Sequence, residues 1–272
     1  MSRITDTTGN TPVIELKDVH VHHKIRGSKL FSPRLVKAVN GVDFTVRRGE
    51  TVGIVGESGC GKSTLASVLV GLQEPTRGTV LFQGAPAGRR NAAARKQFGR
   101  AVGVVFQDPS TALNPRMSIM DTLTDPLRVH GIGTAGSRRA TALELLSVVG
   151  LPASAASALP SQVSGGQRQR VAIARALALE PEVIVADEPT SALDVSVRAQ
   201  VLNLLTDLKA QLNLGMVFIS HDIQTVRYVS DRICVMNAGQ IVEQGDAAQV
   251  FDTPSNDYTR TLLGAAPALL QH

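Results

Sequence analysis

The amino-acid sequence predicts an α/β protein with a mostly parallel core sheet, and two observations lead to that fold class. Short apolar runs, such as residues 51–55 and 183–186, have the form of strands that are buried on both faces. Longer segments with helical spacing of apolar residues lie between these runs, so strands and helices alternate along the chain. Such alternation is typical of parallel sheets whose strands are connected by helices.

The composition is that of an ordinary globular protein that folds without disulfides. The 272 residues are 43% hydrophobic and 19% charged, with a net charge of +5. The two cysteines, Cys60 and Cys234, are too few for a disulfide framework, which suits a reducing compartment. The densest basic group, within residues 89–100, is interpreted as a solvated face. No apolar run approaches the roughly 18 residues that a membrane-spanning helix needs, so a membrane role requires a partner.

The pattern of the N-terminal residues predicts a small antiparallel β-subdomain. Residues 13–22 alternate apolar and polar side chains, which indicates a strand. Residues 36–46 continue that pattern on both sides of Asn40-Gly41, a dipeptide that favours a tight turn, so we expect a strand pair there. Residues 79–82 are predicted as an edge strand, and the apolar residues 101–106 as a strand of the core.

Helical patterns fill most of the remaining chain. We expect a helix from Lys62 to Val70, ended by Gly71. The stretch 117–158 is mostly helical in pattern, with predicted breaks that include Pro126, and reads as an inserted helical subdomain. The C-terminal half predicts helices at 166–179 and 197–211, strands at 183–186 and 216–220, and two strands within 232–242 joined at 237–239.

These elements are expected to form one domain over residues 1–272. Its core and β-subdomain would take up about 12–110 and 160–245, the helical subdomain about 111–160, and a short tail 246–272, of which residues 265–270 are expected to be weakly structured.

A glycine-rich segment after the strand at 51–55 carries the clearest chemistry. It matches the pattern G-x-x-x-x-G-K-[ST] without a mismatch and precedes a predicted helix. The glycines let successive backbone N–H groups surround a phosphate, and the helix N-terminus adds partial positive charge. Lys62 can reach the β and γ phosphates, and Ser63 offers its hydroxyl to Mg²⁺. The residues of this phosphate loop are Gly56, Glu57, Ser58, Gly59, Cys60, Gly61, Lys62, Ser63 and Thr64.

Polar side chains at the ends of three further predicted strands suit triphosphate hydrolysis. Asp187 follows an apolar strand and is a ligand for Mg²⁺ together with Ser63, while Glu188 beside it is expected to face the other way and polarise the attacking water. Gln107 can touch both Mg²⁺ and that water, and His221 can hydrogen-bond a γ-phosphate. Because the carboxyl ends of parallel strands share one edge, we expect these groups to meet.

A second phosphate-binding surface lies on a separate element. The segment Ser164, Gly165, Gly166 and Gln167 opens a predicted helix, whose N-terminus is suited to an anion. One ATP can use both this segment and the phosphate loop only if two chains enclose it. The sequence therefore predicts an ATP-dependent dimer.

These motifs together resemble the nucleotide-binding domain of ATP-binding-cassette proteins over nearly the whole chain. The phosphate loop, Gln107, residues 164–167, the Asp187-Glu188 pair, residues 191–194 and His221 stand in that family's order. The resemblance implies a P-loop fold and a head-to-tail dimer with two ATP molecules at its interface. It also implies that the loop of Asp194 links the two sites and that the helical subdomain docks on a membrane subunit.

Two positions depart from the family's pattern. The segment before the second phosphate surface begins with Val163 in place of leucine. The position of the aromatic residue that stacks on adenine holds His23, so His23 is the predicted adenine contact. His20 and His22 should share one face of their strand and His23 the other, which favours a structural role over a metal site.

Finer features resemble one group of importers. Residues 106–116, 242–245, 251–254 and 258–263 look like segments of oligopeptide, dipeptide and nickel importers, specifically the second of their two ATPases. The resemblance implies ATP and Mg²⁺ as cofactors and no nucleic acid. Some members of the group carry a cysteine-rich extension for an iron–sulfur cluster, and because those cysteines are missing here we expect no cluster. The implied partners are a second ATPase subunit, two transmembrane permeases and, indirectly, an extracytoplasmic solute-binding protein. The protein would lie at the cytoplasmic face of a bacterial plasma membrane.

Two other functions remain open from the sequence. One is a soluble cassette ATPase that acts on nucleic acid or ribosomes, for which the net positive charge is slight support. The other is the ATPase of an exporter. The transported solute, whether a peptide, nickel chelate, glutathione or opine, is chosen by other chains of such a system.

Overall fold

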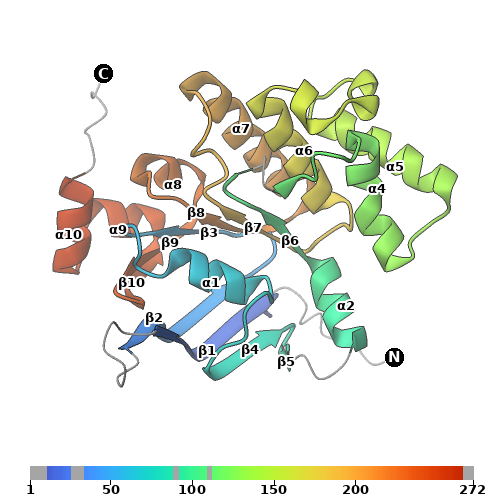
Figure 1. Ribbon diagram of the computed structural model, residues 1–272. Helices are drawn as coiled ribbons and strands as arrows, with labels where there is room; N and C mark the ends of the chain where they lie inside the picture. The colour runs from blue at the N-terminus through green and yellow to red at the C-terminus, as the bar shows by residue number, and fades with distance from the viewer. Residues whose placement is uncertain (1–10, 26–33, 88–91, 109–111, 266–272) are drawn as a thin grey trace, which may run out of the picture.

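The computed structural model describes residues 11–25, 34–87, 92–108 and 112–265 (Figure 1). Its elements, in chain order, are β1 (Ile14–Ile25), β2 (Arg34–Val46), β3 (Thr51–Val55), α1 (Lys62–Leu69), β4 (Arg77–Phe82), β5 (Ala85–Pro86), α2 (Ala92–Ala101), β6 (Val102–Val105), α4 (Ile119–His130), α5 (Ala135–Val148), η1 (Ala153–Ser157), η2 (Pro160–Gln162), α6 (Gly165–Leu177), β7 (Val183–Asp187), α7 (Val195–Leu212), β8 (Gly215–Ile219), α8 (Ile223–Val229), β9 (Arg232–Asn237), β10 (Gln240–Asp246), α9 (Ala247–Asp252) and α10 (Asp257–Gly264).

A six-stranded sheet forms the core, in the order β10-β9-β3-β8-β7-β6. Five of its strands run parallel, and β10 pairs with β9 in the antiparallel sense. Strands β3, β7 and β8 are buried along nearly their whole length, as the apolar runs in the sequence predict. The predicted α/β class with a mostly parallel core sheet is confirmed.

An antiparallel sheet of β2, β1, β4 and β5 covers one side of this core. Figure 1 shows α1 lying between the two sheets. The apolar face of α1, with Leu65, Val68 and Leu69 buried, packs in one cluster with side chains of β1, β2 and β3. The helix that follows the phosphate loop is therefore held from both sides.

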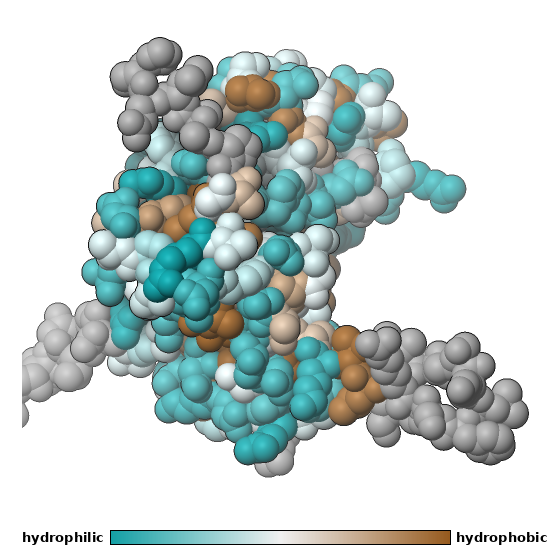
Figure 2. All heavy atoms as spheres, turned by 90° about the vertical axis from the view of Figure 1, so that its left-hand side faces the viewer, coloured by the Kyte–Doolittle hydropathy of each residue, from teal (hydrophilic) through white to brown (hydrophobic). Residues whose placement is uncertain are grey.

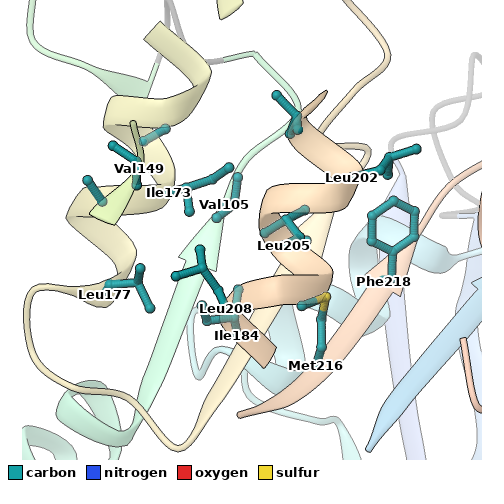
Figure 3. Close-up of a cluster of buried hydrophobic side chains, with 14 of the residues drawn as sticks. Val105, Val149, Ile173, Leu177, Ile184, Leu202, Leu205, Leu208, Met216 and Phe218 are labelled. Atoms are coloured by element: carbon teal, nitrogen blue, oxygen red, sulfur yellow. The ribbon is translucent and has the colours of Figure 1, made fainter. Parts of the chain in front are cut away.

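The other side of the core sheet is covered by α6 and α7. Figure 3 shows apolar side chains of both helices pointing toward those of β6, β7 and β8. The labelled residues in this cluster are Val105, Val149, Ile173, Leu177, Ile184, Leu202, Leu205, Leu208, Met216 and Phe218. Helices α4 and α5 extend this cluster through Leu123 and Leu146, both fully buried, and lie where the helical subdomain is predicted.

Three details of the sequence prediction are wrong. Asn40-Gly41 is not a turn, because β2 is one strand in which the pairing skips from Val42 to Asn40 and Gly41 takes a left-handed φ of 73°, as in a β-bulge. Pro126 does not break α4, whose buried residues Leu123 and Leu127 flank it. A proline removes one helical hydrogen bond, which this packing offsets. Strand β4 is not at the edge, since it pairs with β5 as well as β1.

Among the described residues, the α-helices α2, α8, α9 and α10 were not expected from the sequence. Arg95, Lys96 and Arg100 are exposed on α2, in agreement with a solvated basic face. Helices α9 and α10 lie within the predicted short tail (Figure 1). The face on which they lie is mainly hydrophilic, with hydrophobic residues in separate small groups (Figure 2).

Several sequence predictions fall outside the described residues. They are the loop between 26 and 33, the basic residues at 88–91, the importer-like positions 109–111 and the tail at 266–272. Within the described residues, no helix is both long enough and apolar enough to cross a bilayer.

The packing of α7 gives a direct test of the core. Leu205 is 1% exposed within the cluster, whereas Leu212 on the same helix is 49% exposed. Leu205→Ala should lower the free energy of unfolding by about 2–5 kcal/mol, because it leaves a cavity, and Leu212→Ala by less than about 1 kcal/mol. Denaturant unfolding of both variants measures this difference, and equal losses would contradict the described packing.

Candidate nucleotide-binding site

A cavity of about 710 Å³ opens beside the N-terminus of α1 and has the size of a small-ligand site. It brings together the phosphate loop and the polar side chains that follow β6, β7 and β8. The residues that line it are Val36, Lys37, Ala38, Ser58, Gly59, Gly61, Lys62, Ser63, Thr64, Gln107, Glu188, His221, Ala238 and Gly239.

The phosphate loop needs glycine where other backbone segments come close. At Gly61 the φ is 113°, and a Cβ would lie 2.1 Å from the carbonyl oxygen of Ala38. At Gly56 a Cβ would lie 2.2 Å from the carbonyl oxygen of Met236. The backbone N–H of Gly239 also donates to the carbonyl of Cys60, at 2.8 Å. Strand β2 and the β9–β10 turn therefore hold the loop in its shape.

Lys62 is buried and folds back over its own loop. Its Nζ donates to the carbonyl oxygens of Gly56 and Glu57, each at 2.8 Å, and lies 3.8 Å from the Sγ of Cys60. These contacts fix the ammonium group beside the phosphate loop, where Lys62 lines the cavity with its positive charge. Such a charge suits the phosphates of a nucleotide.

Asp187 ends β7 and is set up for a cation. Burial raises the pKa of its carboxyl, as does the charge of Glu188, while the hydroxyl of Ser63 and the charge of Lys62 oppose that rise. Within the described part of the chain, its buried Oδ1 has no hydrogen-bond partner. An unpaired buried carboxylate oxygen near a serine hydroxyl fits a hard divalent cation that prefers oxygen ligands. The residues present therefore fit the predicted Mg²⁺ site.

Glu188 lines the cavity, as its predicted action on a water near the phosphates requires. Its φ of 47° is left-handed, so the extended backbone of β7 ends at Asp187, and the Glu188 side chain lines the cavity together with residues of the phosphate loop. The backbone N–H of Glu188 donates to the carbonyl of Ile219 on the neighbouring strand, at 2.8 Å. A strained backbone that its neighbours hold in place is typical of a functional position.

The carboxylate of Glu188 is the centre of a small polar network. Gln107 Nε2 donates to Glu188 Oε2 at 3.1 Å, and His221 Nδ1 lies 3.1 Å from the same oxygen. The structure thus brings together the three residues that the sequence indicates as catalytic. A carboxylate held between an amide and an imidazole is placed to act on a water near the phosphates.

The remaining predicted residues lie elsewhere. Ser164 caps α6 in a reciprocal pair with Gln167, with bonds of 3.2 and 2.9 Å, and Asp194 is exposed at the start of α7. Neither segment lines the cavity among the described residues. His23 is exposed, paired across the sheet with Val36 of the cavity wall, and its Nε2 is 3.5 Å from Nε2 of Gln73. The rings of His20 and His22 are 5.6 Å apart, as expected for one strand face.

Sequence reasoning missed the part of the cavity that comes from the β-subdomain and the last hairpin. Lys37 and Ala38 of β2, and Ala238 and Gly239 of the β9–β10 turn, line it without belonging to a recognisable motif. Only the fold brings these segments to the phosphate loop, so no local signal in the sequence indicates them.

The fold and this cavity define a nucleoside triphosphatase of the phosphate-loop class. Comparison with known proteins places the chain more finely. The family model described as ABC transporter matches residues 39–191, which is more than half of the chain. The chain belongs to the ABC transporter family, as the sequence motifs predict, and is an ATP-binding ATPase of that family.

Curated relatives match almost the whole chain. The dipeptide transport ATP-binding protein DppF of Escherichia coli (strain K12) is 43% identical, over 97% of this chain and 79% of the relative. The oligopeptide transport ATP-binding protein AppF of Bacillus subtilis (strain 168) is 45% identical, over 94% of this chain and 78% of the relative.

Solved structures show the same fold. One is a dimer of the ATP-binding cassette MJ0796 in a post-hydrolysis state with ADP and phosphate, with a TM-score of 0.75 and 32% identity, over 86% of this chain and 98% of that one. Another is cbiO1 of Clostridium perfringens, part of the transporter complex cbiONQ. Its TM-score is 0.77 and its identity 26%, over 90% of this chain and 92% of that one.

The electrostatics of Asp187 predict opposite effects on stability and activity. Because its folded-state pKa is raised, the ionised side chain lowers folding stability once the pH exceeds that pKa. Asp187→Asn removes the charge with little change of shape, so the nucleotide-free protein should melt at a higher temperature. ATP hydrolysis should fall at least about 100-fold, the scale of losing one electrostatic group in an active site.

Thermal melting and phosphate release measure the two effects. Asp207→Asn, at an exposed position of α7, is the matched control and should change neither. A lower melting temperature for Asp187→Asn would contradict the account of this carboxylate.

Proposed function

We propose that this chain is the ATP-hydrolysing subunit that powers an importer of peptides or related small solutes. The observation that carries the proposal is the single cavity that joins Lys62 with the network of Glu188, Gln107 and His221. The relatives that match nearly the whole chain are dipeptide and oligopeptide transport proteins, which supports the choice of solute class. This site can hold a triphosphate and activate a water against it.

Two copies of the site are proposed to close around two ATP molecules in a dimer. Ser164 is exposed at the N-terminus of α6, where backbone N–H groups and the helix dipole favour an anion. Because this segment is absent from the described lining of its own chain's cavity, its anion-binding end is available to the ATP of a partner. The exposed Asp194 would lie at the same interface. The dimeric form of the related cassette MJ0796 supports this arrangement.

The geometry of the cavity supports the following hydrolytic roles. Ser63, Asp187 and Gln107 are the proposed ligands of Mg²⁺, which when bound neutralises charge on the phosphates. Glu188 accepts a proton from, or orients, the attacking water, and Gln107 and His221 hold its carboxylate in place. As the γ-phosphate leaves, Lys62 balances its charge and His221, which lines the same cavity, hydrogen-bonds it. His23, across the strand pair from Val36, is the proposed adenine contact.

The coupling to transport needs other chains. The proposed partners are a second ATPase subunit, two transmembrane permeases and, indirectly, an extracytoplasmic solute-binding protein. The chain would then lie peripherally at the cytoplasmic face of a bacterial plasma membrane. The names of the curated relatives, which are transport ATP-binding proteins, support this placement.

Glu188→Gln tests the hydrolytic role, since it keeps the hydrogen-bonding shape and removes the base. Hydrolysis should fall at least about 100-fold, while ATP affinity should stay within about threefold because the phosphate loop is untouched. Steady-state phosphate release and equilibrium binding of ATP measure both quantities. Glu144→Gln, exposed on α5, is the matched control. Normal turnover in Glu188→Gln would refute the proposed role.

The importer function has its own readout. In membrane vesicles that contain the assembled permease complex, uptake of a labelled di- or oligopeptide should stop when Glu188→Gln replaces the wild-type subunit. Uptake that continues at the wild-type rate would show that this chain does not drive the transport.

A further inference from the structure

One contact of the phosphate loop comes from the far end of the chain. The backbone N–H of Glu57 donates to the hydroxyl of Tyr258 at 3.3 Å, across 201 positions of sequence. Tyr258 lies in the first turn of α10. No motif of ATP hydrolysis includes this tyrosine, and it is not among the described residues that line the cavity.

The peptide groups of Glu57 link this tyrosine to the phosphate-binding lysine. On one side of the residue, the N–H is held by Tyr258. On the other side, the carbonyl oxygen accepts from Lys62 Nζ at 2.8 Å and from the backbone N–H of Cys60 at 3.3 Å. Two hydrogen bonds, joined by the backbone of Glu57, therefore connect Tyr258 of α10 with the ammonium group of Lys62.

The position of Tyr258 is itself fixed by several contacts. Its backbone N–H donates to the side chain of Asn256, which caps α10, at 2.9 Å. The carboxylate of Glu243, on β10, accepts from the N–H and hydroxyl of Ser255 at 2.7 and 2.8 Å. Strand β10 pairs with β9, which is the neighbour of β3, and β3 leads directly into the phosphate loop. Helix α10 is thus tied to the same sheet as the loop.

The ring of Tyr258 contributes packing, whereas its hydroxyl contributes a hydrogen bond. The ring is partly buried and packs against the large apolar cluster, so phenylalanine can replace it without leaving a cavity. Burial raises the pKa of the hydroxyl, and the nearby acidic groups Glu57 and Cys60 raise it further, while the Glu57 N–H opposes them. The hydroxyl therefore stays neutral at physiological pH and accepts the hydrogen bond.

We propose that Tyr258 is a positioning residue for ATP, and that α10 supports the phosphate loop through it. The inference rests on the proposed function, because it concerns the same site. A loop that is held in its binding shape before ATP arrives loses less conformational entropy on binding. The hydroxyl should therefore affect the affinity for ATP much more than the rate of the chemical step, in which it takes no part.

The matched pair of variants is Tyr258→Phe and Tyr228→Phe, since the chain has two tyrosines. Tyr228 is 67% exposed on α8, and its hydroxyl donates to Asn203 at 3.2 Å. Loss of one neutral hydrogen bond predicts a KM for ATP that is roughly three- to tenfold higher in Tyr258→Phe. Its kcat should stay within about twofold of wild type, and Tyr228→Phe should change neither constant.

A spectroscopic readout reports on the contact without removing it. Biosynthetic labelling with 3-fluorotyrosine should give two ¹⁹F resonances, which the Tyr228→Phe variant assigns. Addition of Mg²⁺-ATP to the Glu188→Gln protein should shift the resonance of Tyr258 and leave that of Tyr228 in place. This measurement stands even if Tyr258→Phe folds poorly.

The outcomes separate this inference from the function on which it rests. If the wild-type protein does not hydrolyse ATP, the proposed function fails. If it does, and Tyr258→Phe keeps the wild-type KM or loses only kcat, the positioning role is overturned. An ATP-insensitive Tyr258 resonance would overturn it as well.

Discussion

The site depends on the parallel pairing of β3, β8 and β7. Ile54 near the end of β3 is level with Ile219 of β8, and Ile219 is level with Asp187 of β7. This register brings the phosphate loop, the acidic pair and His221 to one edge of the sheet. A shift by one residue in any pair would separate the phosphate-binding lysine from the carboxylates. The apolar clusters packed against both faces of the sheet fix that register.

The same edge holds groups that are unfavourable for folding alone. Burial and the neighbouring charge of Glu188 raise the pKa of the Asp187 carboxyl, so its ionised form is unfavourable, and Glu188 takes a left-handed backbone conformation. The free-energy cost of the partly buried carboxylate and that of the left-handed backbone are each confined to one residue, whereas the apolar clusters that surround the sheet stabilise the whole domain. Oδ1 of the Asp187 carboxylate has no hydrogen-bond partner among the described residues. A bound cation would supply an opposite charge there, and a bound nucleotide would supply the negative charge that Lys62 balances.

Motifs of contiguous residues can be predicted from the sequence, whereas contacts between segments that are far apart in the chain cannot. The phosphate loop, the Asp187-Glu188 pair and the start of α6 are contiguous motifs, so residue order alone identifies them. The left-handed backbone of Glu188, with a φ of 47°, could not be predicted, because strand alternation assumes an extended chain. The turn predicted at Asn40-Gly41 was wrong because a glycine with positive φ serves a bulge as well as a hairpin. The contact of Tyr258 with Glu57 spans 201 positions and has no local signature.

The most direct test of the account is the turnover of ATP per chain as a function of protein concentration, at saturating Mg²⁺-ATP and with the oligomeric state measured on the same samples. The account predicts that turnover follows the fraction of chains in dimers, because Lys62 and Ser164 must reach one nucleotide from different chains. Full turnover in samples that are monomeric at every concentration would contradict it.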